Sequence, residues 1–225
     1  MSSLNIQAVI FDMDGLVLDS EAGYFAAWHE AADKMGLSLD PVFCASLSGA
    51  HGDWVSQRLL QHFGDSFDIQ RFFQLSNTCW RKRVKEQGIP VKAGFFVLLR
   101  LLRALGLPFC LATNSRRHDA EQALQWAGLS SVFPLLISRD DVDHPKPAPD
   151  LFLKAAAKLN LPSQHCLVLE DSPIGVAAAA AAACPCVMVP SIPMVDEAVR
   201  QQARLVLADL AQVADFIAVE YRHSV

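Results

Sequence analysis

The chain has 225 residues, of which 52% are hydrophobic, and its formal net charge is −5 at pH 7. This length allows one core domain with an insertion, and the negative charge argues against a nucleic acid polymer as partner. No apolar run is long enough to span a bilayer and no N-terminal targeting signal is visible, so we expect no membrane partner and a cytoplasmic location. The six cysteines are scattered, as in proteins of a reducing compartment, and Cys184-Pro185-Cys186 alone is weak evidence of a metal or redox pair.

The first half of the chain is expected to contain one strand and then only helices. An apolar run predicts a buried strand over residues 6–11. Residues from about 19 to 88 lack strand-like runs, and apolar positions at helical spacing predict helices at 21–35, 54–63 and 72–84.

From residue 95 onward, predicted helices and strands alternate. The helices are expected at 95–105, 119–127, 150–159 and 175–183, and the strands at 109–112, 132–137, 167–169 and 187–189. The segment 204–221 suggests a last short strand and a helix. This alternation predicts an α/β fold with a doubly wound parallel sheet.

The first predicted strand ends in two carboxylates, Asp12 and Asp14, followed by Gly15. Buried charges need a partner or a metal, and open α/β sheets bind ligands just beyond the ends of their strands. The arrangement suits phosphoryl transfer through an aspartyl phosphate, with Asp12 as nucleophile and metal ligand and Asp14 as general acid and base. The alternative is a strand that simply ends in a solvated turn.

A second polar cluster, Thr113-Asn114-Ser115, follows the strand predicted at 109–112. A hydroxyl group there can donate to a phosphoryl oxygen, helped by backbone N–H groups of the turn. The competing interpretation is an ordinary helix N-cap at Asn114 or Ser115, and for this cluster considered alone it is the stronger one.

A third cluster holds Lys146 among three prolines. Prolines stiffen the backbone around the lysine, and a lysine held in this way is a point charge suited to a phosphate. Pro149 fits the first turn of the following helix. The alternative is a solvated lysine in a proline-rich loop.

The fourth cluster, Glu170-Asp171, follows the strand predicted at 167–169. Two adjacent acids after a buried strand suit a hard cation with oxygen ligands, such as Mg²⁺. Asp171 or Ser172 could also cap a helix that begins at Pro173, and this role is compatible with metal binding.

Together the four clusters supply a nucleophile, an acid/base, phosphate donors, a cation and a metal site, in chain order. With these motifs the chain resembles the haloacid dehalogenase (HAD) superfamily of phosphohydrolases, in the β-phosphoglucomutase-like subfamily. The resemblance runs from about residue 8 to residue 190. The matching motifs are Asp12-Met13-Asp14-Gly15, Thr113-Asn114-Ser115, Lys146-Pro147-Ala148-Pro149-Asp150 and Leu169-Glu170-Asp171-Ser172.

The resemblance implies a Rossmann-like core domain, residues 1–18 and 89–225, with an inserted all-helical cap domain at 19–88. It implies Mg²⁺ as the cofactor. The expected metal ligands are Asp12, the backbone carbonyl of Asp14, Glu170 and Asp171. Asp12, Asp14, Thr113 and Lys146 form the expected catalytic set, and Asn114, Ser115 and Arg116 are the candidate substrate contacts of the core.

Specificity is expected to come from the cap, where the sequence says less. Residues 48–53 lie at the position of the family's specificity loop, and His51 is a candidate substrate contact there, although a simple turn with a solvated histidine explains it equally well. Glu21 and Tyr24 on the first cap helix are further candidates, whereas Trp28 is expected in the cap's core.

Departures from the family patterns reduce the number of activities that the sequence allows. β-Phosphoglucomutases typically carry a histidine where Tyr24 aligns and an arginine where Gly52 aligns, so their absence favours a phosphatase over a mutase. Haloacid dehalogenases lack the second aspartate, so Asp14 argues against dehalogenation. Phosphonoacetaldehyde hydrolases use a cap lysine, whereas Lys34 is off the expected position.

We therefore expect a Mg²⁺-dependent phosphatase that acts on a small phosphorylated metabolite, either a sugar phosphate or a nucleoside monophosphate. A hexose-phosphate mutase is the alternative among enzymes. A non-catalytic regulatory or partner-binding domain is the alternative of another class. The natural substrate and the oligomeric state stay open.

Overall fold

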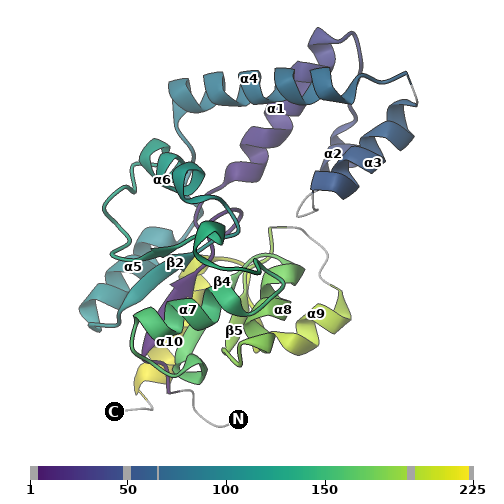
Figure 1. Ribbon diagram of the computed structural model, residues 1–225. Helices are drawn as coiled ribbons and strands as arrows, with labels where there is room; N and C mark the ends of the chain where they lie inside the picture. The colour runs from purple at the N-terminus through teal and green to yellow at the C-terminus, as the bar shows by residue number, and fades with distance from the viewer. Residues whose placement is uncertain (1–4, 48–51, 65, 192–195, 223–225) are drawn as a thin grey trace. The chain divides into compact units, whose positions relative to one another are not determined.

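The computed structural model describes residues 5–47, 52–64, 66–191 and 196–222. The chain forms two compact units, which we call the sheet unit (Met1–Leu18 with Pro90–Val225) and the helical unit (Asp19–Ile89). The ribbon of both units is drawn in Figure 1. Within the described ranges, no helix has both the length and the apolar character needed to cross a membrane.

The sheet unit is built on six parallel strands in the order β3-β2-β1-β4-β5-β6. The strands are β1 (Ala8–Phe11), β2 (Phe109–Ala112), β3 (Leu136–Ile137), β4 (Cys166–Glu170), β5 (Cys186–Met188) and β6 (Leu205–Val206). The chain winds outward from β1 to β3, then returns to β4 and winds the other way. The order therefore reverses between β1 and β4, which is where doubly wound sheets bind ligands. The predicted doubly wound parallel sheet is confirmed.

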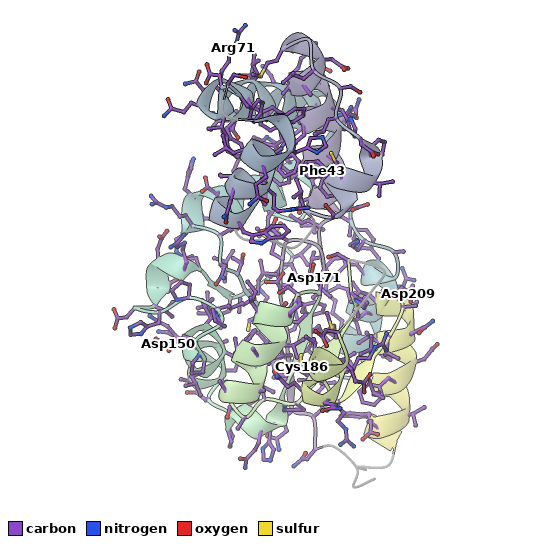
Figure 2. The ribbon with its side chains drawn as sticks, turned by 90° about the vertical axis from the view of Figure 1, so that its right-hand side faces the viewer. Phe43, Arg71, Asp150, Asp171, Cys186 and Asp209 are labelled. Carbon is purple, nitrogen blue, oxygen red and sulfur yellow. The ribbon has the colours of Figure 1, made fainter. Side chains whose placement is uncertain are left out.

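Helices cover both faces of this sheet. Ala8 and Ile10 of β1 pack in one hydrophobic cluster with buried residues of α7 (Asp150–Lys158) and α8 (Pro173–Ala181). Successive side chains of a strand point to opposite faces, and Phe11 contacts the ring of Phe95 in α5 (Phe95–Ala104) at 6.0 Å. Helix α10 (Leu210–Arg222) packs on α5. Figure 2 shows Cys186 of β5 among the densely packed side chains of this unit.

The helical unit contains α1 (Ser20–Lys34), α2 (Pro41–Ala45), α3 (Gly52–Phe63) and α4 (Ile69–Gln87). Its core is largely aromatic. Phe72 is fully buried, and its ring lies 5.5 Å from that of Phe67 and 6.3 Å from that of Trp28. Trp28 therefore belongs to this core, as expected. Asp40 and Asp68 cap α2 and α4 by accepting backbone N–H groups.

Several elements differ from the sequence-based predictions. The strand predicted at 132–137 shortens to β3, because Pro134 has no N–H group for a ladder and Phe133 packs on Phe11 and Phe109 instead. Helices α2 and α9 (Glu197–Gln202) were not expected, since helices this short do not produce a clear apolar period. The remaining helix, α6 (Arg117–Trp126), begins two residues earlier than predicted.

Candidate active site

The first candidate residue, Asp12, directly follows β1 at the reversal point of the sheet. Its backbone N–H donates to the carbonyl of Leu169 at 3.0 Å, which places it beside the end of β4. The chain then turns sharply, because the Met13 carbonyl accepts from the N–H groups of Val17 and Leu18. Gly15 within this turn has a φ of 82°, a conformation that glycine adopts without strain.

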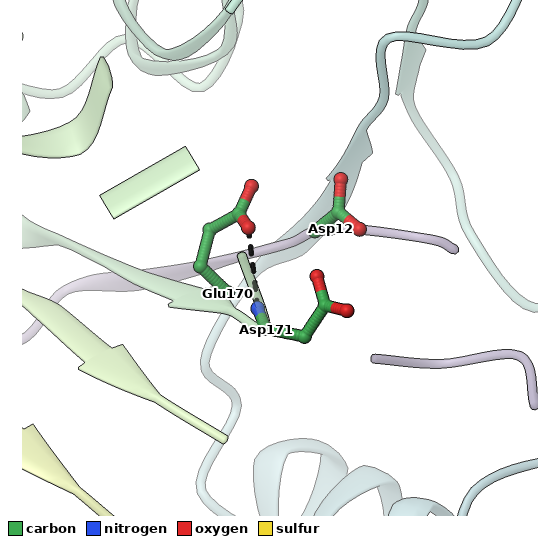
Figure 3. A group of neighbouring side chains, drawn as sticks. All are labelled: Asp12, Glu170 and Asp171. Carbon is green, nitrogen blue, oxygen red and sulfur yellow. Dashed lines mark hydrogen bonds between the residues drawn. The ribbon is translucent and has the colours of Figure 1, made fainter. Parts of the chain in front are cut away.

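Three carboxylates converge at this point of the sheet. Asp12, Glu170 and Asp171 are all buried, and one ligand oxygen from each lies within 4.8 Å of the others. Figure 3 shows the three side chains turned toward one another from the ends of two neighbouring strands. Strands β1 and β4 bring them together, because Phe11 is in register with Leu169 and the next residues are Asp12 and Glu170.

Lys146 supplies one positive charge to this cluster. Its Nζ donates to Asp12 Oδ1 at 2.5 Å, to Glu170 Oε1 at 2.6 Å and to the carbonyl of Ala112 at 2.9 Å. The lysine is therefore buried rather than solvated, and it contacts two of the carboxylates. The buried cluster thus combines one ammonium group with three carboxyl groups.

Burial and charge act in opposite directions on these groups. Burial raises the pKa of Asp12, Lys146 lowers it, and Glu170 and Asp171 raise it further, so that the net shift is upward. Burial lowers the pKa of Lys146, but the charges of Asp12 and Glu170 outweigh burial and raise it above its ordinary value. The lysine therefore stays charged, and Asp12 needs more positive charge nearby to remain ionised.

Glu170 is held by hydrogen bonds at both of its oxygens. Oε1 accepts from Lys146, and Oε2 accepts from the Ser172 hydroxyl at 2.9 Å and from the backbone N–H groups of Asp171 and Ser172 at 3.2 and 3.3 Å. Ser172 also caps α8, which begins at Pro173 as expected, by accepting from the Gly175 N–H at 3.2 Å. The sequence indicated the cap but not its contact with Glu170.

The turn after β2 brings its polar residues to the same edge of the sheet. Thr113 is buried, and its Oγ1 accepts from the Ser115 N–H at 3.0 Å, which leaves its own proton available for an outside acceptor. The Ser115 hydroxyl donates to Asp14 Oδ2 at 2.8 Å. These bonds link the turn to the loop that follows β1.

Asn114 holds the backbone of Lys146 rather than a helix end. Its Oδ1 accepts from the Lys146 N–H at 2.9 Å, and its Nδ2 donates to the Lys146 carbonyl at 3.1 Å. The N-cap position of α6 is occupied by Arg116, which is exposed and makes no side-chain capping bond, so the competing interpretation of Asn114 or Ser115 as the N-cap is wrong. The physical reason is that both side chains bond to other loops, so the helix begins beyond them.

The candidates of the helical unit are less defined. Tyr24 is 38% exposed and stacks on Trp80 with ring centroids 4.9 Å apart. Glu21 lies on α1, but its side chain is outside the described part of the structure, and His51 lies outside the described residues altogether. The structure therefore brings together the core candidates Asp12, Asp14, Thr113, Asn114, Ser115, Lys146, Glu170 and Asp171.

The cluster has the properties of a site for a divalent cation. Its candidate ligands are carboxylate oxygens, and their separations of up to 4.8 Å are near the about 4.2 Å that separates opposite ligands of Mg²⁺. Because the cluster is buried, solvent screens its charges only weakly. The described residues contain no other group of this kind.

Known proteins resemble this chain over most of its length. The model of the haloacid dehalogenase-like hydrolases matches residues 6–183. The chain is 33% identical over 210 residues to a probable pseudouridine-5'-phosphatase of Drosophila melanogaster, covering 90% of this chain and 89% of that protein. It is 29% identical over 176 residues to the fructose-1-phosphate phosphatase YqaB of Escherichia coli, covering 77% and 91%.

A solved structure supports the same assignment. The HAD family hydrolase from Deinococcus radiodurans, crystallised with bound phosphate and sodium, is 29% identical and superposes with a TM-score of 0.83 over 96% of this chain and 97% of that one. The family model covers most of the chain and contains all four motifs up to Ser172. The chain therefore belongs to the haloacid dehalogenase-like hydrolases.

Proposed function

We propose that this hydrolase is a Mg²⁺-dependent phosphatase that cleaves a small phosphoric monoester through a phosphorylated Asp12. The observation that carries the proposal is the buried contact of Lys146 with Asp12 and Glu170, at 2.5 and 2.6 Å, inside a cluster of three carboxylates. A buried group this rich in charge is costly to a fold, whereas phosphoryl transfer uses a nucleophile, a fixed cation and a metal site together.

In the first step, a carboxylate oxygen of Asp12 attacks phosphorus, and the bond between phosphorus and the ester oxygen breaks. The Asp14 carboxyl group gives its proton to the departing alkoxide. The Ser115 hydroxyl, at 2.8 Å from Asp14 Oδ2, orients this group. Lys146 stabilises the negative charge that develops on the phosphoryl oxygens, and Thr113 donates its free proton to one of them.

In the second step, water attacks the phosphorus of the aspartyl phosphate and gives a proton to Asp14. The bond between phosphorus and Asp12 breaks, which releases inorganic phosphate and restores both aspartates. Exclusion of water by the buried surroundings strengthens these electrostatic interactions.

The residues proposed to hold Mg²⁺ are Asp12, Asp171 and the backbone carbonyl of Asp14. Glu170 contributes through Lys146, since both of its oxygens already accept hydrogen bonds. When bound, the cation supplies the positive charge that Asp12 needs to stay ionised and that the phosphoryl group needs in the transition state.

The relatives suggest two substrate classes, as the sequence did. One is described as a pseudouridine-5'-phosphatase and the other as a fructose-1-phosphate phosphatase. We propose that the natural substrate is a phosphorylated sugar or a nucleoside monophosphate. The contacts that select between them are proposed to come from the helical unit, with Glu21, Tyr24 and His51 as candidates.

The test is phosphate release by the purified full chain. With Mg²⁺ and p-nitrophenyl phosphate we expect turnover that EDTA abolishes and excess Mg²⁺ restores. A panel that contains pseudouridine 5'-phosphate, fructose 1-phosphate and β-glucose 1-phosphate would then identify the substrate class. The Asp12→Asn variant is the control for contaminating phosphatases. Activity that survives exhaustive chelation, or absence of phosphate release from the whole panel, would overturn the proposal.

A further inference from the structure

Gly175 is a buried residue in the first turn of α8, and ordinary helix energetics do not explain its presence there. Glycine is less favourable than alanine inside a helix, and the rest of α8 after Val176 consists of alanines. Its φ is not among the positive values that require glycine. The reason for glycine at this position must therefore be space.

The space in question is occupied by the carboxylate of Glu170. A Cβ atom added to Gly175 would lie 1.8 Å from Glu170 Cδ, 2.0 Å from Oε1 and 2.1 Å from Oε2. Real Cβ atoms essentially never approach other heavy atoms within 3.0 Å. A side chain at position 175 would therefore force the Glu170 carboxylate to move from its observed place.

From this place Glu170 contacts the reactive end of the site. Its Oε2 sits at the start of α8, where it accepts three hydrogen bonds, and its Oε1 holds Lys146 at 2.6 Å. Lys146 in turn reaches Asp12 at 2.5 Å. A displacement of about one ångström at the carboxylate exceeds what a hydrogen bond of this kind tolerates, so it would separate Glu170 from Lys146.

We propose that Gly175 is a positioning residue for phosphoryl transfer. The space left by its missing side chain accommodates the Glu170 carboxylate, which holds Lys146 against Asp12. The catalytic part of this inference rests on the proposed phosphatase function, whereas the steric part does not. Gly15 has a similar relation to Asp171, because a Cβ atom added to Gly15 would lie 2.0 Å from Asp171 Oδ2. However, the φ of 82° at Gly15 makes any substitution there strained. A substitution at Gly175, where φ is not positive, tests the steric clash without added backbone strain.

The decisive experiment is a double-mutant cycle on the melting temperature of the metal-free protein. In the wild-type background, Gly175→Ala should lower the melting temperature, because the methyl group displaces a buried charged group from its hydrogen bonds. In the Glu170→Ala background the same change should raise it, because alanine favours the helix and fills the vacated space. A purely helical effect predicts an increase in both backgrounds, so an increase in both would overturn the proposal.

Activity and metal affinity provide the second readout. We expect Gly175→Ala to lower kcat/KM by about 10- to 100-fold and to weaken Mg²⁺ binding measured by calorimetry, the scale typical for groups that support metal ligands. Gly23→Ala is the matched control for stability and Mg²⁺ affinity, because Gly23 also lies in a helix but its added Cβ would meet nothing nearer than 3.7 Å. It should leave the Mg²⁺ affinity unchanged and raise the melting temperature, as expected for alanine in a helix without a steric clash.

The outcomes separate the two proposals. If Gly175→Ala binds Mg²⁺ and turns over substrate like the wild type, the positioning role is wrong while the phosphatase function stands. If the wild type hydrolyses no phosphoric monoester, the proposed function is wrong. The melting-temperature cycle still tests whether the Glu170 carboxylate occupies the space beside Gly175. If Gly175→Ala fails to fold and Glu170→Ala does not rescue it, the clash is not with Glu170 and the proposal is overturned.

Discussion

The sheet unit and the helical unit bury different kinds of side chain. The buried polar residues of the sheet unit are mostly charged and belong to one cluster, Asp12, Lys146, Glu170 and Asp171. Among the described residues of the helical unit, the buried polar ones are Ser20 and Ser76, and the packing is dominated by rings. The buried charged side chains of the sheet unit set the geometry of the proposed reaction, whereas the packed aromatic rings of the helical unit set the shape of that unit. We therefore expect substitutions in the two units to affect different quantities.

The largest effect is expected for the loss of the nucleophile. Asp12→Asn keeps the shape of the side chain but removes the attacking charge, so kcat should fall by at least about a thousandfold. The fold should persist, because Glu170 still pairs with Lys146 and the cluster loses part of its excess negative charge. Phosphate release and circular dichroism measure the two results. Asp119→Asn on the exposed face of α6 is the control, and retention of more than a tenth of the wild-type rate by Asp12→Asn would contradict the assignment.

Lys146→Met should affect both chemistry and stability. The variant loses the buried cation, so kcat/KM should fall by about 100-fold or more. The metal-free protein should lose about 3–5 kcal/mol of unfolding free energy, because Asp12 and Glu170 lose the buried cation that they share. Mg²⁺ should restore part of this stability in urea unfolding. Lys158→Met, at an exposed site in the last turn of α7, is the control. Equal stability of both variants without metal would show that Lys146 does not balance the cluster.

Phe72→Ala tests the other side of the comparison. Removal of this buried ring should destabilise the helical unit by about 3–5 kcal/mol, because Trp28, Phe67 and Phe73 lose their shared contact. The Mg²⁺ affinity of the sheet unit should stay unchanged. Urea unfolding and calorimetry separate the two effects, and Phe96→Ala, at a ring that is 50% exposed, is the control. A parallel loss of Mg²⁺ affinity would show that the two units are not independent in this respect.

The smallest effect is expected at Asp141, away from the carboxylate cluster. Burial raises the pKa of Asp141, but hydrogen bonds from Ser138 and Arg117 outweigh it and lower the pKa overall. A carboxyl group with a lowered pKa stabilises the fold above its unfolded-state pKa, and this contribution is lost as the pH falls through the folded-state value.

Asp141→Asn should therefore cost about 1–2 kcal/mol at pH 7, and the difference from the wild type should shrink in acid. Unfolding free energies measured between pH 7 and pH 3 test this. The exposed Asp143→Asn is the control. A difference that does not change with pH would show that the ionised form of Asp141 is not what stabilises the fold.

The sequence predicted the reactive edge of the sheet because parallel strands obey a simple rule. Residues that follow two neighbouring parallel strands lie at the same edge, so Asp12 and Glu170 could be expected near one another. The contact of Lys146 with both of them could not, since Lys146 lies on a loop between β3 and α7 and no strand register specifies its position. The use of Asn114 to hold that loop depends on the same tertiary contact.

Short and buried features were the least predictable. The five residues of α2 and the six of α9 are too few to show a period. Gly175 resembles any small residue in an alanine-rich helix until the position of the Glu170 carboxylate is known. Recognition of substrate is equally hard to predict, because an aromatic side chain such as that of Tyr24, which stacks on Trp80, suits both packing and binding.

The central place of β1 in the sheet has a consequence for biosynthesis. β1 is the first strand to be made, yet both of its neighbours, β2 and β4, are made much later. Asp12 must wait for Lys146, 134 positions further along, before its charge is paired. Non-local pairing of this kind slows folding. The nascent strand exposes its apolar side chains and its unpaired backbone edges until the neighbouring strands have been made. We expect ribosome-bound chains that stop before Cys166 to bind chaperones, and chains that extend past Met188 to become resistant to protease.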